Sequence, residues 1–287
     1  ARTRASGDLS ARVTPYGRDE LAEMAASFND MAPQLVERMK LKNDMALAME
    51  VQQHLLPGRP PAMEGMDIAA LSLYCDETGG DYFDFLEFAQ DDASHADIVI
   101  GDVTGHGVSA ALFMATGRAL LRGRAVGQPG PGALLTEVND LLCQDTHLTG
   151  RFITLFFLRL DRACKEMVWC RAGHDPGLLY DPASDAFDQL QGTGIPLGAV
   201  AGWTYAEMRR PWITPGQVLV LYTDGIHEAR DPDDAMYGKE RMEAVVRREA
   251  AGPASAVANA LVADLKEFKA GLPLEDDVTL VVIKATA

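Results

Sequence analysis

The sequence predicts an α+β fold with antiparallel sheet, preceded by a helical N-terminal extension. Two observations support this prediction. Short β-rich runs cluster and are joined by short turns, rather than alternating strictly with helices as in a doubly wound parallel sheet. A long heptad pattern precedes them and ends at a segment rich in proline.

The N-terminal extension is predicted to be helical from about residue 18 to 56. Its apolar residues alternate three and four apart, as in the a/d seam of a coiled coil: Leu21, Met24, Phe28, Met31 and Leu35. In the same register the seam meets Arg38 and Lys42 and resumes at Met45, Met49 and Leu56, which indicates a shift in the seam. Pro33 should kink or break the helix, and "HLLPGRPPAM" should end it. The alternative is an amphipathic helix lying on its own domain, but the sustained heptads favour a dimeric helix.

Beyond this linker the chain is predicted to alternate between strand clusters and helices. The β-rich runs are "DIAALSLY", "DIVIGDV", "FITLFFLRL", "EMVWCRAG", "GQVLVLYTDG" and "DVTLVVIK". Helical patterns cover residues 107–124, about 131–146, and stretches near 238–250 and 253–270.

Composition excludes several classes of function. Residues 1–57 carry 7 Lys/Arg against 8 Asp/Glu, so nearly all of the net charge of −16 lies in the following domain. Such acidity argues against nucleic acid or an anionic membrane surface as a partner. The four cysteines form no C-x-x-C pair and are expected to be reduced thiols. No run reaches the roughly 18 apolar residues that a transmembrane helix needs.

Aspartates recur where predicted strands end. Asp102 ends "DIVIGD", Asp224 ends "VLVLYTD", Asp276 and Asp277 precede "VTLVVIK", and Asp81 lies in "TGGDYFDF". Such positions place several carboxylates at one rim of the sheets, where they repel one another unless cations compensate them. Oxygen ligands without Cys or His suit Mg²⁺ or Mn²⁺.

Two such cations can lower the pKa of a shared water and bind phosphoryl oxygens, so the pattern indicates metal-assisted hydrolysis of a phosphate ester. The run "GDVTGHGVSAALFMATGRALL" reads as strand, glycine-rich turn and helix. It would let backbone approach a metal or phosphate.

Seven motifs in order resemble the metal-dependent protein phosphatases of type 2C, and most closely their bacterial branch of the stage II sporulation protein E type. They are "EVQQHLLP", "GGDYFDF", "GDVTGHGVSAALFM", "AGHDPGLLY", "GIPLG", "LYTDGIHEARD" and "EDDVTLVVI", and they span about residues 50–283. The resemblance implies a four-layer α-β-β-α sandwich of two antiparallel sheets with a dinuclear site at one edge.

The same resemblance implies the ligands of two Mn²⁺ or Mg²⁺ ions. Asp102 would bridge both ions, assisted by the carbonyl of Val103. Asp81 would help to hold the second ion, and Asp224 with Asp276 the first. Asp276 is preferred to Asp277 because it stands three residues before Thr279, as in the family's D-[DN]-x-T pattern. Asp102 and Asp224 are the residues on which catalysis is expected to depend. No counterpart of the phosphate-binding arginine of the eukaryotic relatives is found.

The N-terminal run "GDLSARVTPYGRDELAEMAASFNDM" resembles the second half of a HAMP signalling module. We therefore expect a partial HAMP module over residues 1–33, a signalling helix over 34–57 and a phosphatase domain over 58–287. HAMP modules follow a membrane helix, and the chain opens without Met. The expected setting is thus the cytoplasmic part of an inner-membrane protein whose N-terminal region is missing here.

The predicted function is hydrolysis of phosphoserine or phosphothreonine by a metal-activated water, without a covalent phosphoenzyme, under the control of the upstream sensor. By family resemblance, the substrate would be a small partner protein resembling an anti-sigma-factor antagonist. A homodimer through the N-terminal helix is expected.

Several neighbouring residues are assigned plainer roles. His106 is either a general acid or phosphate contact, or a histidine that caps the following helix. His174 is expected to brace a loop, and Ser109 to start its helix. Asp84, Asp231 and the pair Asp233–Asp234 are expected in turns or in solvent.

Two other functions compete with the phosphatase. "GGDYF" superficially matches the signature turn of diguanylate cyclases, but Tyr82 stands where they carry an acidic residue, and the other strand-end aspartates would be unexplained. A non-catalytic binding module would not need a complete set of site aspartates.

Overall fold

The computed structural model describes residues 12–14, 17, 19–76, 78–86, 95–127, 130–146, 150–161 and 164–286. The chain divides into two compact units, residues 1–51 and 52–287.

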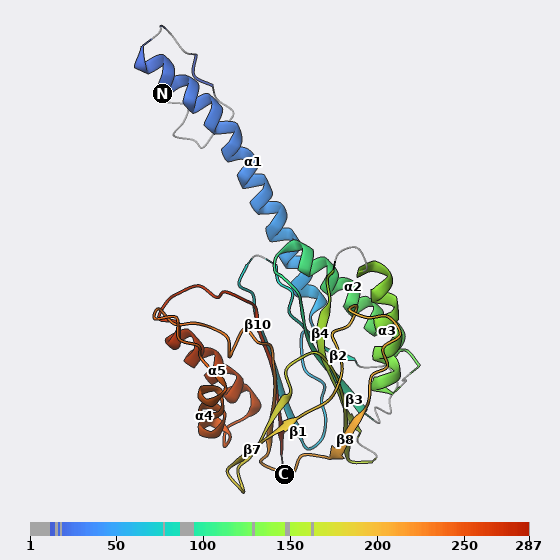
Figure 1. Ribbon diagram of the computed structural model, residues 1–287. Coiled ribbons are helices and arrows are strands. Elements are labelled where there is room, and N and C mark those ends of the chain that lie inside the picture. Colours follow the sequence, from blue (N-terminus) through green and yellow to red (C-terminus); the bar gives the residue numbers. More distant parts are fainter. Residues whose placement is uncertain are drawn as a thin grey trace. The chain divides into compact units, whose positions relative to one another are not determined.

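The larger unit contains two five-stranded antiparallel sheets (Figure 1). The first has the order β1-β10-β9-β6-β7, with bounds β1 Met66–Leu73, β6 Gly177–Asp181, β7 Ala186–Leu190, β9 Val218–Tyr222 and β10 Val278–Ala285. The second has the order β2-β3-β4-β5-β8, with bounds β2 Tyr82–Leu86, β3 His95–Val103, β4 Ile153–Asp161, β5 Glu166–Ala172 and β8 Met208–Pro211. The predicted antiparallel pairing is therefore confirmed.

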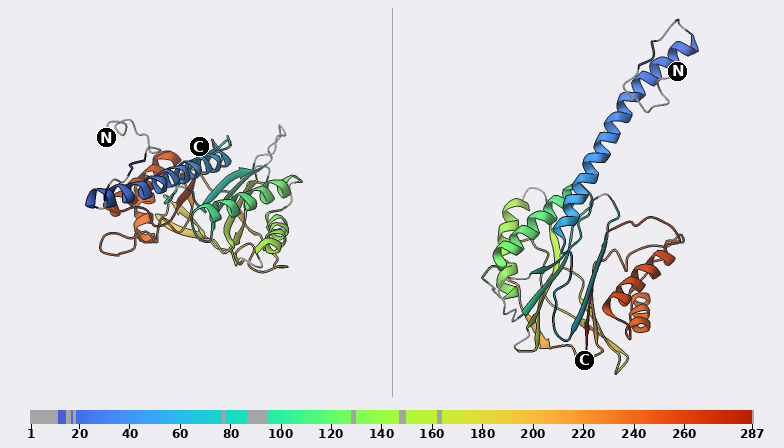
Figure 2. Two further views of the ribbon diagram at one scale, coloured as in Figure 1. Left: turned by 90° about the horizontal axis from the view of Figure 1, so that it is seen from above. Right: turned by 180° about the vertical axis from the view of Figure 1, so that it is seen from behind.

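Helices cover the outer face of each sheet, as the two views in Figure 2 also show. Helices α2 (Val108–Ala125) and α3 (Pro131–Thr146) pack on the second sheet, and α4 (Lys239–Glu249) and α5 (Ala254–Phe268) pack on the first. The four-layer α-β-β-α sandwich is confirmed.

Alternate residues of each central strand pack in opposite directions, which explains why these runs are apolar throughout. In β3, Ile98 and Ile100 pack between the two sheets, whereas Val99 packs among α2 and α3 residues. In β9, Leu221 packs between the sheets, whereas Val220 packs among α4 and α5 residues. Both faces of each sheet are therefore buried.

Asp84 shows how this burial overturned one prediction. It was expected in a turn or in solvent, but it lies fully buried in β2. Arg122 of α2 donates two hydrogen bonds to its carboxylate, at 2.7 and 2.6 Å, and the Tyr82 hydroxyl donates a third at 2.6 Å. A buried carboxylate needs such partners, so a charged pair joins α2 to the second sheet.

Helix α1 (Glu20–Leu55) ends where the proline-rich segment predicted. It does not break at Pro33, which lies inside the helix. Within the smaller unit, Asn29 exchanges two hydrogen bonds with the backbone of Val13, at 2.8 and 2.6 Å. Four apolar residues of the predicted seam are exposed, namely Leu21, Met24, Met31 and Leu35. No helix in the described ranges is long and apolar enough to span a membrane.

Candidate metal centre

The site aspartates come from four segments that meet at one edge of the larger unit. Asp102 lies at the end of β3, and Asp81 lies just before β2. Asp224 follows β9 by two residues and Asp276 precedes β10 by two residues. Because β9 and β10 are antiparallel neighbours, the end of one strand meets the start of the other. The four carboxylates thus come from both sheets.

Close backbone contacts hold these segments together and require glycine. A Cβ atom at Gly80 would lie only 2.7 Å from the carbonyl oxygen of Val103 and 3.3 Å from a carboxylate oxygen of Asp102. A Cβ atom at Gly225 would collide with the carbonyl oxygen of Asp277. The glycines of the "GGD" and "TDG" motifs therefore permit the approach that brings the aspartates together.

Burial and mutual repulsion raise the pKa of each of the four carboxyl groups. Burial and the charge of Asp102 raise the pKa of Asp81 well above its usual range. Burial, followed by the charges of Asp224 and Asp276, raises the pKa of Asp102 to about 8. Burial and the charge of Asp276 raise the pKa of Asp224 to about 6, and burial raises that of Asp276. Burial and the like charges of their neighbours thus both disfavour the ionised form of these carboxylates.

This electrostatic environment fits divalent cations, because bound cations would stabilise the ionised carboxylates. In the described part of the chain, no three His, Cys, Asp or Glu side chains stand close enough together to chelate one ion. The fit of this site to divalent cations therefore rests on its oxygen donors and on the repulsion between their negative charges.

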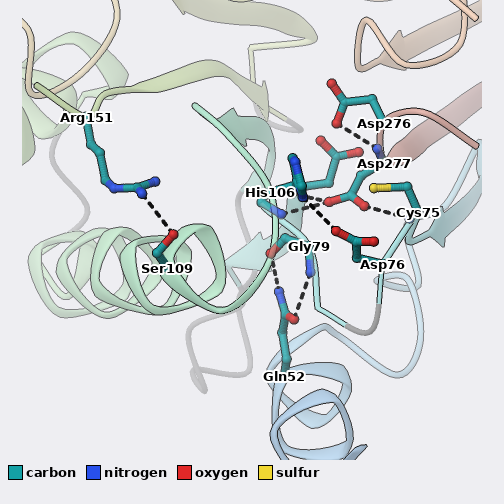
Figure 3. Close-up of polar contacts among 11 residues, drawn as sticks. Gln52, Cys75, Asp76, Gly79, His106, Ser109, Arg151, Asp276 and Asp277 are labelled. Carbon is teal, nitrogen blue, oxygen red and sulfur yellow. Dashed lines mark hydrogen bonds and ion pairs between the residues drawn. The ribbon is translucent and has the colours of Figure 1, made fainter. Parts of the chain in front are cut away.

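Asp276 and Asp277 differ sharply in environment (Figure 3). Asp277 is buried, and its carboxylate accepts hydrogen bonds from the backbone N–H groups of Cys75 at 2.9 Å, Gly80 at 2.7 Å and Asp81 at 3.4 Å. Asp276 is exposed, and one of its oxygens accepts the N–H of Asp277 at 2.8 Å. Asp277 thus anchors the loop that carries Asp81, whereas Asp276 faces outward.

Threonines complete the support of Asp81. The hydroxyl of Thr223 donates to Asp81 Oδ2 at 2.8 Å and accepts the N–H of Thr279 at 3.0 Å. This contact joins the start of β10, the end of β9 and the aspartate before β2. The sequence motifs contain both threonines, but their roles were not predicted.

Gln52, near the end of α1, was also missed. It is buried, and its side-chain amide forms two hydrogen bonds with the backbone of Gly79: Nε2 donates at 2.6 Å and Oε1 accepts at 3.2 Å. Gly79 directly precedes Gly80 and Asp81, so the helix end is bonded to the loop that carries a site aspartate (Figure 3). The signal was the "EVQQHLLP" motif, which contains this glutamine.

The two site histidines have different settings. His174 was predicted to brace a loop, and it holds the loop between β5 and β6 against β4 and the end of β9: Thr154 Oγ1 lies 2.8 Å from its Nδ1, and the Tyr222 carbonyl lies 3.1 Å from its Nε2. A carbonyl only accepts, so Nε2 carries the proton and Nδ1 accepts from Thr154. His106 is exposed, and its Nδ1 lies 2.6 Å from Asp76 Oδ2. The charge of His106 opposes the rise in the pKa of Asp276 that burial causes, so His106 lies within electrostatic range of the cluster.

The start of α2 corrects the prediction for Ser109. The N-cap is Gly107, and no side chain caps this helix. The Ser109 hydroxyl instead accepts a hydrogen bond from Arg151 Nη2 at 2.8 Å, while Nη1 donates to the Thr104 carbonyl at 3.0 Å (Figure 3). Arg151 thereby supports the glycine-rich turn after Asp102. The turn assignment of Asp231 is confirmed, because its carboxylate accepts the N–H groups of Asp233 and Ala235.

Comparison with known proteins identifies the family. A family model described as "Stage II sporulation protein E (SpoIIE)" matches residues 92–286. The chain belongs to the SpoIIE family. A HAMP domain model matches residues 1–37, so the resemblance of the N-terminal run to that module is also confirmed.

Characterised relatives of this SpoIIE-family chain are phosphatases. Phosphoserine phosphatase RsbU of Bacillus subtilis (strain 168) is 26% identical over 249 residues, which are 86% of this chain and 71% of RsbU. Phosphoserine phosphatase RsbP of the same organism is 25% identical over 203 residues, which are 70% of this chain but only 48% of RsbP. The SpoIIE-family chain is therefore a protein phosphatase, and the diguanylate-cyclase and binding-module alternatives are set aside.

Solved structures confirm the fold. The SiaA-PP2C domain of Pseudomonas aeruginosa matches with a TM-score of 0.75 at 24% identity, covering 86% of this chain and 98% of that domain. The RsbU and RsbW domains of Rv1364c from Mycobacterium tuberculosis match with a TM-score of 0.64 at 28% identity, covering 79% of this chain and 62% of that one. The larger unit thus has the PP2C fold.

Proposed function

We propose that this chain hydrolyses phosphoserine or phosphothreonine on a small regulatory protein, with two Mn²⁺ or Mg²⁺ ions as cofactors. The observation that carries the proposal is the convergence of Asp81, Asp102, Asp224 and Asp276, from both sheets, at one edge of a PP2C fold, where their like charges repel one another. The names of RsbU and RsbP as phosphoserine phosphatases support the substrate class.

The residues that would hold the ions are Asp102 with the Val103 carbonyl, Asp81 for the second ion, and Asp224 with Asp276 for the first. Asp276 is favoured over Asp277 because three backbone N–H groups already occupy the Asp277 carboxylate. When bound, two such ions supply a water of lowered pKa and neutralise phosphoryl oxygens. No residue of the chain then needs to act as a covalent nucleophile.

The remaining residues hold this set in place or handle a proton. Asp277, Thr223 and Gln52 fix the loop that carries Asp81, so they act as positioning residues. His106 donates its Nδ1 proton to Asp76, which leaves Nε2 free to face solvent beside the cluster. A protonated His106 would be placed to give its proton to the departing serine or threonine oxygen.

Regulation is proposed to come through the N-terminal part. The proposed division is a signalling module over residues 1–33, a connecting helix over 34–57 and the phosphatase domain over 58–287. The HAMP match over residues 1–37 supports the presence of the first part, and the SpoIIE match over residues 92–286 supports that of the last. Leu21, Met24 and Leu35 are 73%, 71% and 46% exposed, and covering them in a homodimer would remove apolar surface from water. The natural protein would be tethered to the inner membrane by a segment before this HAMP module, with the phosphatase on the cytoplasmic side. The substrate would be a protein resembling an anti-sigma-factor antagonist.

The test is hydrolysis of p-nitrophenyl phosphate with Mn²⁺, Mg²⁺ or EDTA, together with calorimetric titration of Mn²⁺. We expect metal-dependent turnover that falls by at least about 100-fold in Asp102→Ala and Asp224→Ala, with weaker Mn²⁺ binding in both. Asp188→Ala, on the exposed part of β7, serves as the matched control and should retain turnover.

The fold of the site variants is checked by thermal unfolding in EDTA. Removing one like charge from the cluster should not lower the melting temperature, because each carboxylate is destabilised by its neighbours. A wild-type protein that neither binds Mn²⁺ nor turns over the substrate would contradict the proposed function.

A further inference from the structure

A cavity of about 200 Å³ opens beside the metal centre, with Asp224 and Asp276 in its lining. Small-molecule sites usually enclose about 300 Å³ or more, so this cavity suits one extended side chain better than a whole ligand. Its other walls come from the segment after β9 and the segment before β10.

The first wall is a small hairpin with its own backbone hydrogen bonds. The N–H of Tyr237 donates to the Ala229 carbonyl at 2.8 Å, and the N–H of Gly238 donates to the His227 carbonyl at 3.0 Å. Arg230 and Met236 pair across the hairpin. These backbone hydrogen bonds fix the shape of the wall, so binding a side chain against it would cost little ordering entropy.

A buried lysine joins the two walls. Lys269, 2% exposed at the end of α5, lies with its Nζ 3.2 Å from the Arg230 carbonyl and 3.3 Å from Glu275 Oε1. The charge of Glu275 is therefore partly compensated. The guanidinium of Arg230 is likewise engaged by Asp234, at 2.8 Å from its carbonyl and 3.2 Å from its carboxylate.

Glu228 supplies the negative charge that the cavity leaves uncompensated. It is exposed, and within the described ranges no hydrogen bond or ion pair engages its carboxylate. Its charge acts on the metal centre, since it contributes to the raised pKa of Asp224. The cavity also offers apolar surface, because Met236 is 52% exposed and Leu274 is only partly buried.

We propose that this cavity binds a lysine or arginine side chain that the phosphoprotein substrate presents beside its phosphoserine. The inference rests on the proposed function, in which Asp224 and Asp276 hold a metal ion that binds the phosphoryl group beside this cavity. The aliphatic stem would lie along Met236 and Leu274, and the cationic end would meet Glu228. Glu228 is thus a specificity-determining residue.

The test uses phosphoserine peptides in sets of three. Within a set, the peptides differ at a single position, which carries Lys, norleucine or Glu. One set is made for each of the three positions on either side of the phosphoserine. For at least one of these positions, we expect the Mn²⁺-loaded wild type to hydrolyse the Lys peptide with a kcat/KM about three- to tenfold higher than that of the norleucine peptide. The Glu peptide should have the lowest kcat/KM of the set. The ratio of the Lys to the norleucine peptide is the readout within each variant, because it cancels any effect on the metal centre.

Charge changes at position 228 should move that ratio. We expect Glu228→Gln to bring it close to one and Glu228→Lys to favour the Glu peptide, whereas Glu228→Asp should retain most of the preference. Glu137→Gln, on the exposed face of α3, is the matched control and should keep the wild-type ratio. Fluorescence polarisation with peptides that carry a non-hydrolysable phosphonate should show the same order of affinities.

The proposal is overturned if the wild type shows no preference for Lys at any position, if norleucine is preferred, or if Glu228→Gln keeps the full preference. Hydrolysis of p-nitrophenyl phosphate distinguishes failure of the cavity proposal from failure of the proposed phosphatase function. An enzyme that hydrolyses it but ignores peptide charge refutes this cavity's role alone, whereas an enzyme that fails to hydrolyse it refutes the proposed function.

Discussion

Two adjacent aspartates before β10 have opposite roles. The Asp277 carboxylate accepts three backbone N–H groups from the segment around Gly80, and burial keeps these bonds away from water. Asp276 remains exposed on the side of the other site carboxylates. Two neighbouring residues therefore differ: Asp277 holds the loop, whereas Asp276 is the one proposed as a metal ligand.

His174 provides a prediction at the same scale. Its burial lowers its pKa to about 4, below the usual value of 6.5, so the unfolded chain binds the extra proton more readily between these values. The contribution of neutral His174 to stability is fully present above pH 6.5 and is lost as the pH falls toward 4. Between pH 6.5 and 4, the free energy of unfolding of the wild type should fall further than that of His174→Gln, which lacks this titrating group. We expect the additional loss to reach up to about 3 kcal/mol.

Denaturant titrations in EDTA, at steps between pH 4 and 7.5, measure this difference. Gln can accept from Thr154 and donate to the Tyr222 carbonyl, so the variant should fold at neutral pH. Identical pH profiles for the two proteins would show that His174 is not buried in its neutral form.

The end of α1 matters as an element because it is bonded to the loop before β2. Gln52→Ala would leave the buried N–H and carbonyl of Gly79 without these partners. We expect a loss of about 1–3 kcal/mol in the free energy of unfolding and weaker Mn²⁺ binding, since Gly79 leads into Asp81. Gln53→Ala, at the neighbouring exposed position, is the matched control. Equal Mn²⁺ affinities in both variants would mean that the contact does not position the metal centre.

The strands differ in how strongly the sequence marks them. The runs that form β1, β3, β4, β5, β9 and β10 are strongly apolar, and all were predicted. Strands β2, β6, β7 and β8 have only four or five residues, and they were not singled out. Strand β8, "MRRP", is mostly exposed and ends in proline, so neither apolar pattern nor propensity marks it.

At the scale of the whole molecule, a HAMP module and a PP2C phosphatase share one chain, and helix α1 begins inside the HAMP match and continues past its end to Leu55. If a dimeric seam in this helix controls the enzyme, Met45→Glu and Met49→Glu should change phosphatase activity at least about threefold by disrupting that seam. Their circular dichroism spectra and melting temperatures should match the wild type. Lys40→Glu, at an outer heptad position, is the control.

Sedimentation equilibrium should accompany these assays. The expected result is a weaker dimer for the two seam variants and an unchanged one for Lys40→Glu. Variants that keep both full activity and the wild-type assembly state would rule out a role for this seam.

The sequence by itself determined the α+β class with antiparallel sheet, the helices and the strand-end aspartates, because periodicity and strand termini are local properties of the chain. The two-sheet sandwich was implied only by the family resemblance. The motifs, in their order, also identified the family, and they supplied the metal-ligand set that is now a proposal.

Tertiary structure decided what local pattern does not encode. Asp277 meets Cys75 across 202 residues of sequence, Asp84 is buried because Arg122 reaches it from α2, and Gln52 finds Gly79 27 residues away. Whether a carboxylate or an amide faces solvent, a cation or a backbone N–H depends on which distant segment packs against it, and only folding brings that segment near.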